Sequence, residues 1–151
     1  MKKFRFSLET VLDYKQQVLD SLQMEHGVIM AQVRRQEEYL EGLEEDYRET
    51  DAEFGQQKLE GIAILDAMWY EQYLRAMERQ IQQAVLRLEE LRKQEEAKRA
   101  EVVAAKQDTS SIEKLKEKKL DSYNKAVQKN EEAVIDEFVM TTRAMAALQG
   151  A

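Results

Sequence analysis

The feature that most constrains this chain is a stretch from residue 62 to residue 149 that contains neither glycine nor proline. Its 88 residues are rich in Ala, Leu, Glu, Lys, Gln and Arg, the residue types that favour helix. The stretch therefore predicts one long helix or two nearly continuous ones. At a rise of roughly 1.5 Å per residue, a single helix would be about 130 Å long. A chain of 151 residues cannot wrap such a helix into a globule, so the remaining residues must pack along it.

The composition favours an elongated all-helical protein. Charged residues make up 35% of the chain and aromatic residues only 7%, which disfavours a wide core between two layers. The absence of proline and the presence of only five glycines disfavour loop-rich and β-sandwich folds. Because there is no cysteine, no secretory signal and no long apolar run, we expect a cytoplasmic protein that does not insert into a membrane.

Heptad spacing predicts that the first helix is one strand of a coiled coil. We expect this helix to begin at Ser7, a good N-cap residue, and to span about residues 7–54. Its expected end is Gly55, which suits the C′ position. Ten of its fourteen a and d positions are apolar or aromatic. The a positions are Leu12, Leu19, His26, Val33, Leu40, Tyr47 and Phe54, and the d positions are Leu8, Lys15, Leu22, Ile29, Gln36, Leu43 and Thr50.

A predicted turn over residues 55–61 makes the fold class all-α, a two-helix antiparallel coiled-coil hairpin. The second helix, about residues 62–148, resumes the heptad and extends beyond the first, and residues 1–151 form a single elongated domain. A turn centred near residue 58 would place Leu43 opposite Tyr73 and Tyr39 opposite Met77. The a positions of the second helix are Ala67, Leu74, Ile81, Leu88, Glu95 and Val102, and its d positions are Tyr70, Met77, Ala84, Leu91, Lys98 and Ala105.

The C-terminal part of the second helix leaves two questions open. Ser110-x-x-Glu113 resembles a capping box, so both a break over residues 108–111 and a continuous helix are compatible with the sequence. An apolar stripe then continues at helical spacing through Val134, Phe138 and Met145. No part of the hairpin can cover this stripe, which indicates either an outside partner or a helix that folds back.

Charge is distributed unevenly along the hairpin. Residues 37–60 hold ten acidic and two basic residues, whereas residues 106–129 hold seven lysines and four acidic residues. The hairpin brings the lysine-rich stretch beside Lys2, Lys3 and Arg5, so the turn end is acidic and the end with the termini is basic. Such polarity can orient docking into an oppositely charged cavity, although a charge run is more often a solvated face. Nucleic-acid binding is not expected, because the net charge is −7 and no basic stripe is interleaved with aromatic residues.

No pattern of catalytic residues is present, and we expect no enzyme, no metal and no cofactor. His26 is the only histidine, and its seam position favours a packed polar residue over a metal ligand. Carboxylate pairs are common, but a two-helix hairpin has no enclosed pocket that could tune their pKa values for acid–base work.

The aromatic residues suggest a binding surface instead. Trp69 and Tyr73 are four residues apart and therefore neighbours on one face of the helix. With Tyr39 and the bordering Leu43, Tyr70 and Met77, they are expected to form a partly exposed patch about 20–25 Å from the turn. The patch is either packing over the seam or a protein-binding site, since exposed Tyr and Trp clusters often anchor partners.

Several motifs along the whole chain resemble the flagellar type III export protein family FliJ. They are Phe4-Arg5-Phe6-x-Leu8-x-x-Val11-Leu12, Gly61-Ile62-Ala63, Tyr70-Glu71-Gln72-Tyr73-Leu74 with Ile81, Glu113-Lys114-Leu115-Lys116-Glu117-Lys118-Lys119, and Asp136-Glu137-Phe138. The resemblance implies a non-enzymatic coiled coil similar to the central stalk (gamma) subunit of rotary ATP synthases. It also implies a location in the cytoplasm at the membrane of the flagellar base.

The resemblance further implies three kinds of partner. Family members insert the end with both termini into the hexameric export ATPase FliI and promote its assembly, contact the export-gate protein FlhA, and bind export chaperones. Carried over to this chain, the gate surface comprises Tyr39, Leu43, Tyr47, Trp69, Tyr70, Tyr73 and Met77. The ATPase-binding residues are Lys2, Lys3, Arg5, Lys114, Lys116, Lys118, Lys119 and Phe138. The alternative is a generic coiled-coil adaptor, or the equivalent stalk of a virulence-type injectisome or rotary ATPase.

Overall fold

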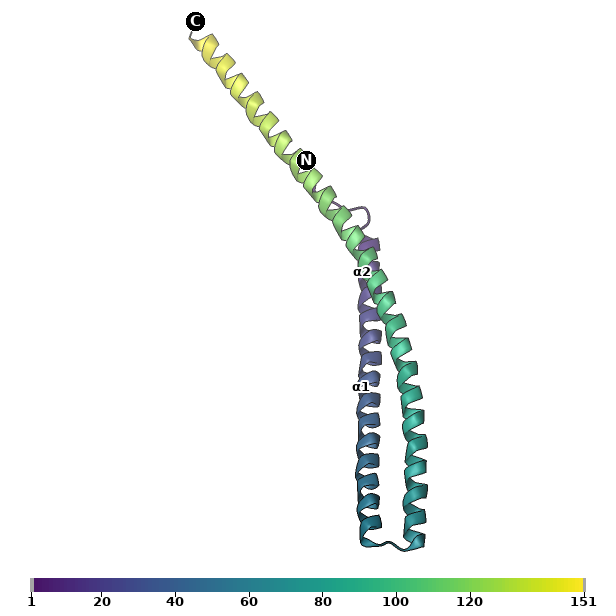
Figure 1. Ribbon diagram of the computed structural model, residues 1–151. Helices are drawn as coiled ribbons and strands as arrows, with labels where there is room; N and C mark the ends of the chain where they lie inside the picture. The colour runs from purple at the N-terminus through teal and green to yellow at the C-terminus, as the bar shows by residue number, and fades with distance from the viewer. Residues whose placement is uncertain (1, 151) are drawn as a thin grey trace. The chain divides into compact units, whose positions relative to one another are not determined.

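The computed structural model describes residues 2–150 and contains two long helices that pack against each other (Figure 1). Helix α1 spans Glu9–Glu60 and helix α2 spans Ile64–Gln149. No strand is present among the described residues, so the predicted all-α hairpin is confirmed. By contacts between Cα atoms, the chain divides into two compact units. One unit, which we call the hairpin unit, comprises residues 19–104. The other, which we call the terminal unit, comprises residues 2–18 and 105–150 of the described chain.

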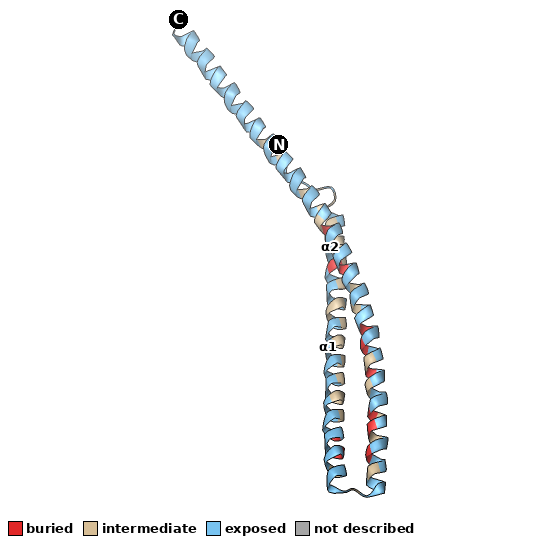
Figure 2. Ribbon diagram, in the orientation of Figure 1, coloured by how far each residue is buried: buried red, intermediate tan, exposed pale blue. Residues whose placement is uncertain are grey.

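In the hairpin unit the core is the predicted coiled-coil seam. Every a and d position of α1 and α2 in this unit is buried or half-buried. Figure 2 shows these buried residues on the facing sides of the two helices. The buried members are Leu19, Thr50, Phe54, Tyr70, Leu74, Met77, Ala84, Leu88, Leu91 and Val102. The heptad pattern in the sequence therefore identified the core residues.

The predicted turn over residues 55–61 was wrong, because α1 continues through Gly55 to Glu60. Phe54 is buried and stacks on Tyr70, which holds this part of α1 in the helix despite the poor helix propensity of the following glycine. The helix ends instead at Gly61, whose φ of 100° lies in the left-handed region. Its N–H donates to the carbonyl oxygen of Gln57 at 2.9 Å. Gly61 is thus the C′ residue that Gly55 was expected to be.

The later turn moves the pairing of the two helices away from the predicted one. A turn centred near residue 58 would place His26 opposite Glu90, but His26 contacts Glu95. Similarly, Tyr73 donates to Asp46 rather than lying opposite Leu43. The pairing is displaced by roughly one helical turn, which preserves the heptad positions because the seam repeats along each helix.

The terminal unit contains the start of α1, which begins two residues later than expected. The carbonyl oxygen of Leu8 accepts the first helical hydrogen bond, from Leu12, and so α1 begins at Glu9 rather than Ser7. Cross-helix ion pairs join Lys15 to Asp108 and Lys116 to Glu9 in this unit.

Helix α2 is continuous through residues 108–111, which resolves one question that the sequence left open. The hydroxyl groups of Thr109 and Ser111 donate hydrogen bonds to the carbonyl oxygens four residues earlier. Such bonds satisfy the hydroxyl groups of threonine and serine inside a helix. Every residue from 131 to 150 is exposed (Figure 2). This last part of α2 therefore packs against nothing among the described residues of its unit.

Candidate functional site

The first candidate site is the aromatic region near the turn of the hairpin unit. Helix α2 places Trp69, Tyr70 and Tyr73 within five residues, and α1 contributes Phe54. The Phe54 and Tyr70 rings stack with centroids 4.9 Å apart, and the Trp69 and Tyr73 rings stack with centroids 5.3 Å apart. Trp69 also meets the Tyr70 ring edge-on at 5.1 Å, so a row of four rings runs from the core to the surface.

The row is part core and part surface. Tyr70 and Met77 are buried, so these two predicted contact residues support the site from beneath. Trp69 is exposed, and Tyr73, Leu43 and Tyr47 are half-buried. Tyr39 is exposed and makes no ring contact with the row among the described residues.

Three tyrosine hydroxyl groups in this region lie beside carboxylates. Tyr47 donates to Glu78 at 2.8 Å, and this hydrogen bond is the main reason that the Tyr47 pKa is raised. Tyr73 donates to Asp46 at 3.3 Å, and the charge of Asp46 raises the Tyr73 pKa. Burial, followed by a hydrogen bond with Glu53, raises the pKa of Tyr70. These phenols therefore remain neutral hydrogen-bond donors at neutral pH, and they suit a binding surface rather than proton transfer.

The residues that lie nearest the turn on α2 were not predicted as a site from the sequence. Ile64, Leu65 and Met68 are exposed, although each is a large apolar residue. The heptad pattern of the sequence could have identified these three residues as exposed. Counting back from Ala67 at a, they occupy the e, f and b positions, which point away from the seam and are normally polar.

The second candidate site is the basic part of the terminal unit. Lys2, Lys3 and Arg5 are exposed in the segment before α1, where the Tyr123 hydroxyl donates to the Lys2 carbonyl oxygen at 2.6 Å. The Phe4 ring also packs on Tyr123, with centroids 5.6 Å apart. This segment, which sequence reasoning did not link to Tyr123, is therefore held against α2.

The lysines of α2 that are predicted to bind the ATPase differ in their exposure and in their ion pairing. Lys114, Lys118 and Lys119 are exposed and form no ion pair among the described residues. Lys116 is half-buried, and its Nζ lies 2.9 Å from Glu9. Farther along α2, the Phe138 side chain is 71% exposed. The terminal unit thus offers free positive charge and, separately, an apolar helix face.

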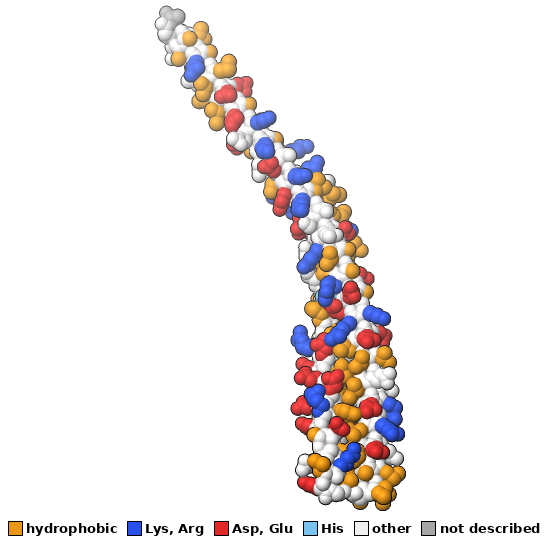
Figure 3. Space-filling view, in the orientation of Figure 1, with side chains coloured by type: hydrophobic (Ala, Val, Ile, Leu, Met, Phe, Trp, Pro, Cys, Tyr) orange, Lys and Arg blue, Asp and Glu red, His pale blue; other side chains and the backbone are white. Residues whose placement is uncertain are grey.

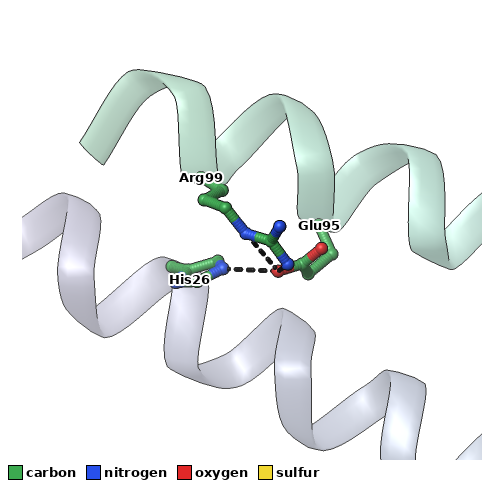
Figure 4. A network of polar contacts seen from close by, with 3 residues as sticks. All are labelled: His26, Glu95 and Arg99. Carbon is green, nitrogen blue, oxygen red and sulfur yellow. Dashed lines mark hydrogen bonds and ion pairs between the residues drawn. The ribbon is translucent and has the colours of Figure 1, made fainter. Parts of the chain in front are cut away.

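His26 lies in the seam, as predicted, and forms a polar network with two residues of α2 (Figure 4). Its Nε2 donates to Glu95 Oε1 at 2.9 Å, and Arg99 donates to the same oxygen at 2.6 Å. The hydrogen bond from His26, and then that from Arg99, lowers the pKa of Glu95. No group of three or more potential metal ligands occurs within residues 2–150.

Within the described part of the chain, no helix is both long and apolar enough to span a membrane. A search of curated proteins and a search of solved structures each found no match. The family model described as flagellar FliJ protein matches residues 4–146, which is almost the whole chain. The hairpin fold and this match agree with the resemblance seen in the sequence motifs, and the chain therefore belongs to the FliJ family of flagellar export proteins.

Proposed function

We propose that this chain is a non-enzymatic stalk that couples the flagellar export ATPase to the export gate. The observation that carries the proposal is the family match over residues 4–146 of a two-helix hairpin. In this proposal, the terminal unit binds inside the ring of the hexameric ATPase FliI and promotes its assembly and activity. The aromatic region of the hairpin unit binds the export gate FlhA, and export chaperones are further partners. The protein acts in the cytoplasm, at the membrane of the flagellar base.

The terminal unit has two properties that suit a ring cavity. Its exposed lysines, among them Lys118 and Lys119, are free to pair with carboxylates of a partner. The exposed helix from residue 131 to residue 150 provides the apolar residues Val134, Ile135, Phe138 and Met145 on one face. An apolar face of this length with no internal cover favours a partner that encloses it.

The aromatic region has the composition of a binding hot spot. Trp69 and Tyr73 present stacked rings whose positions are fixed by buried Tyr70 and Phe54. Rigid aromatic side chains lose little conformational entropy on binding, which is one reason that they dominate protein interfaces. The aromatic surface is therefore preorganised for binding.

Charge reversal at two lysines tests the ATPase contact. Lys118→Glu with Lys119→Glu breaks no ion pair among the described residues, so folding should be unaffected. We expect the double variant to stimulate the cognate ATPase several-fold less than the unmodified chain, with a larger loss at low salt because screening weakens exposed charges. The matched control is Arg79→Glu with Lys93→Glu, which makes the same charge change in the hairpin unit. Equal stimulation by both double variants would refute docking by charge.

Replacement of one ring separates the gate contact from the ATPase contact. Tyr73→Ala should weaken binding to the gate by about tenfold or more, as expected for a hot-spot residue, and leave ATPase stimulation unchanged. The binding can be measured by titrating the cytoplasmic part of the gate protein. If the variant loses both activities together, the ring has a structural role only and the gate assignment fails.

A further inference from the structure

The start of helix α2 carries an apolar surface that the hairpin core does not use. We define the outer turn surface as Ile64, Leu65 and Met68, with Trp69 at its edge. The exposed fractions of these side chains are 79%, 79%, 50% and 58%, respectively. Figure 3 shows apolar side chains gathered at this end of the hairpin unit. Four large apolar residues within the first six of a helix are therefore in contact with solvent.

Packing of the hairpin does not explain this surface. The residues that close the core at this end are Phe54, Tyr70 and Leu74, with Ile62 and Ala67 packed against them. At 100° per residue, Ile64, Leu65, Met68 and Trp69 occupy the side of α2 opposite the seam. Exposed apolar residues that lie singly are common, but a contiguous group of this kind marks an interaction site.

Charge around the surface indicates what it binds. Asp66 precedes Trp69 by three residues and Glu71 follows Met68 by three, so a carboxylate borders each edge of the apolar stripe. Neither carboxylate forms an ion pair among the described residues. From residue 49 to residue 71 the chain has six acidic residues and one basic residue, Lys58, whose Nζ lies over the Phe54 ring. The next cation on the same face of α2, Arg75, lies four residues beyond Glu71.

We propose that the outer turn surface binds a short amphipathic helix of a partner protein, with apolar residues facing Leu65 and Met68 and flanking Lys or Arg residues facing Asp66 and Glu71. The position of Arg75 limits the contact to the first turns of α2. A second copy of the chain would bring these carboxylates against their own copies, and anionic lipid would be repelled by them. This site borders the proposed gate contact, with which it shares Trp69, but it does not use Tyr73 or the terminal unit.

The chain has a built-in probe for this proposal, because Trp69 is its only tryptophan. The experiment titrates the 151-residue chain with a synthetic amphipathic helix made of leucine and lysine, about 18 residues long and without aromatic residues. We expect a saturable blue shift of the Trp69 emission as the ring loses contact with water. Leu65→Ser with Met68→Ser should weaken the binding by on the order of a hundredfold, since two apolar contacts are lost and each contributes on the order of a factor of ten.

Matched controls make the result specific to this surface. Leu86→Ser removes an apolar residue that is 59% exposed at another outward position of α2, and it should leave the peptide affinity unchanged. A peptide of leucine and glutamate should not bind. The proposal is overturned if the Leu65/Met68 variant binds the lysine peptide as well as the Leu86 variant does, or if the glutamate peptide binds equally well. It is also overturned if the Trp69 shift occurs with phosphatidylglycerol vesicles instead of the peptide, or if it depends on the protein concentration alone, as self-association would require.

Discussion

At the scale of single residues, Glu95 shows how a polar position can be accommodated in a coiled-coil seam. The side chains of Glu95 and His26 are only 13% and 15% exposed, so both lose hydration when the helices pack. This loss would destabilise the fold if neither side chain had a hydrogen-bond partner. The bonds from His26 and Arg99 to one carboxylate oxygen replace that hydration. The same bonds favour the ionised carboxylate and lower its pKa.

The lowered pKa predicts how the stability contributed by Glu95 depends on pH. Because the pKa in the folded state lies below the ordinary value of 4.5, the unfolded state binds protons first as the pH falls. The contribution of Glu95 should therefore be complete above about pH 5 and decrease as the pH falls through the folded pKa. We expect urea unfolding to show a stability difference between the unmodified chain and Glu95→Gln that narrows with acidification. A difference that stays constant from about pH 6 to pH 3 would contradict this account.

Glycine substitutions test which residue ends α1. Gly61→Ala should destabilise the protein by about 1 kcal/mol, because a residue with a Cβ atom is strained at positive φ. Gly55→Ala is the matched control, since Gly55 lies inside α1 with no atom within 4 Å of an added Cβ. It should stabilise the protein by roughly 0.5–1 kcal/mol, as alanine does inside a helix. Chemical denaturation of the two variants measures both effects, and the opposite order would place the helix end at Gly55.

At the scale of the helices, the aromatic region divides into residues that hold the hairpin together and residues that face solvent. Tyr70 is buried at a d position and stacks on Phe54 of the other helix. Trp69 lies at c, and its ring contacts within residues 2–150 are with Tyr70 and Tyr73 of its own helix. Neighbours in the sequence thus have different roles because the helix turns them toward different surroundings.

That division predicts unequal effects of alanine substitution at adjacent positions. Tyr70→Ala should destabilise the hairpin by about 3 kcal/mol, as loss of a buried ring does. Trp69→Ala should cost less than about 1 kcal/mol, since the indole is largely exposed. Thermal or urea unfolding monitored by circular dichroism compares the two variants. Similar losses at both positions would mean that Trp69 is part of the core.

The same helices show what the sequence could and could not predict. Burial was predictable because the seam repeats every seven residues, and Leu19, Leu74 and Leu91 are buried where the heptad placed them. The pairing was not predictable, because it depends on which of two glycines ends α1, and the heptad pattern alone is compatible with either choice. For the candidate site, this error placed Tyr39 beside Met77, whereas the d position of Tyr70 already predicted its burial.

At the scale of the whole molecule, the proposed function requires each unit to have its own binding partner. The hairpin unit presents aromatic residues near the turn, and the terminal unit presents free lysines and an exposed helix from residue 131 to residue 150. Residues 131–150 pack against nothing among the described residues, so their removal should leave the free energy of hairpin unfolding unchanged. Their loss would therefore affect a partner without affecting the fold.

The most direct test of the central claim is the ATPase rate of the cognate export ATPase with the full chain and with a chain truncated after Asn130. We expect the full chain to increase the rate, and the truncated chain, shown to be helical and equally stable, to lose most of that stimulation. Failure of the full chain to stimulate the ATPase would contradict the stalk assignment. Equal stimulation by both chains would contradict the role of the exposed C-terminal helix in docking.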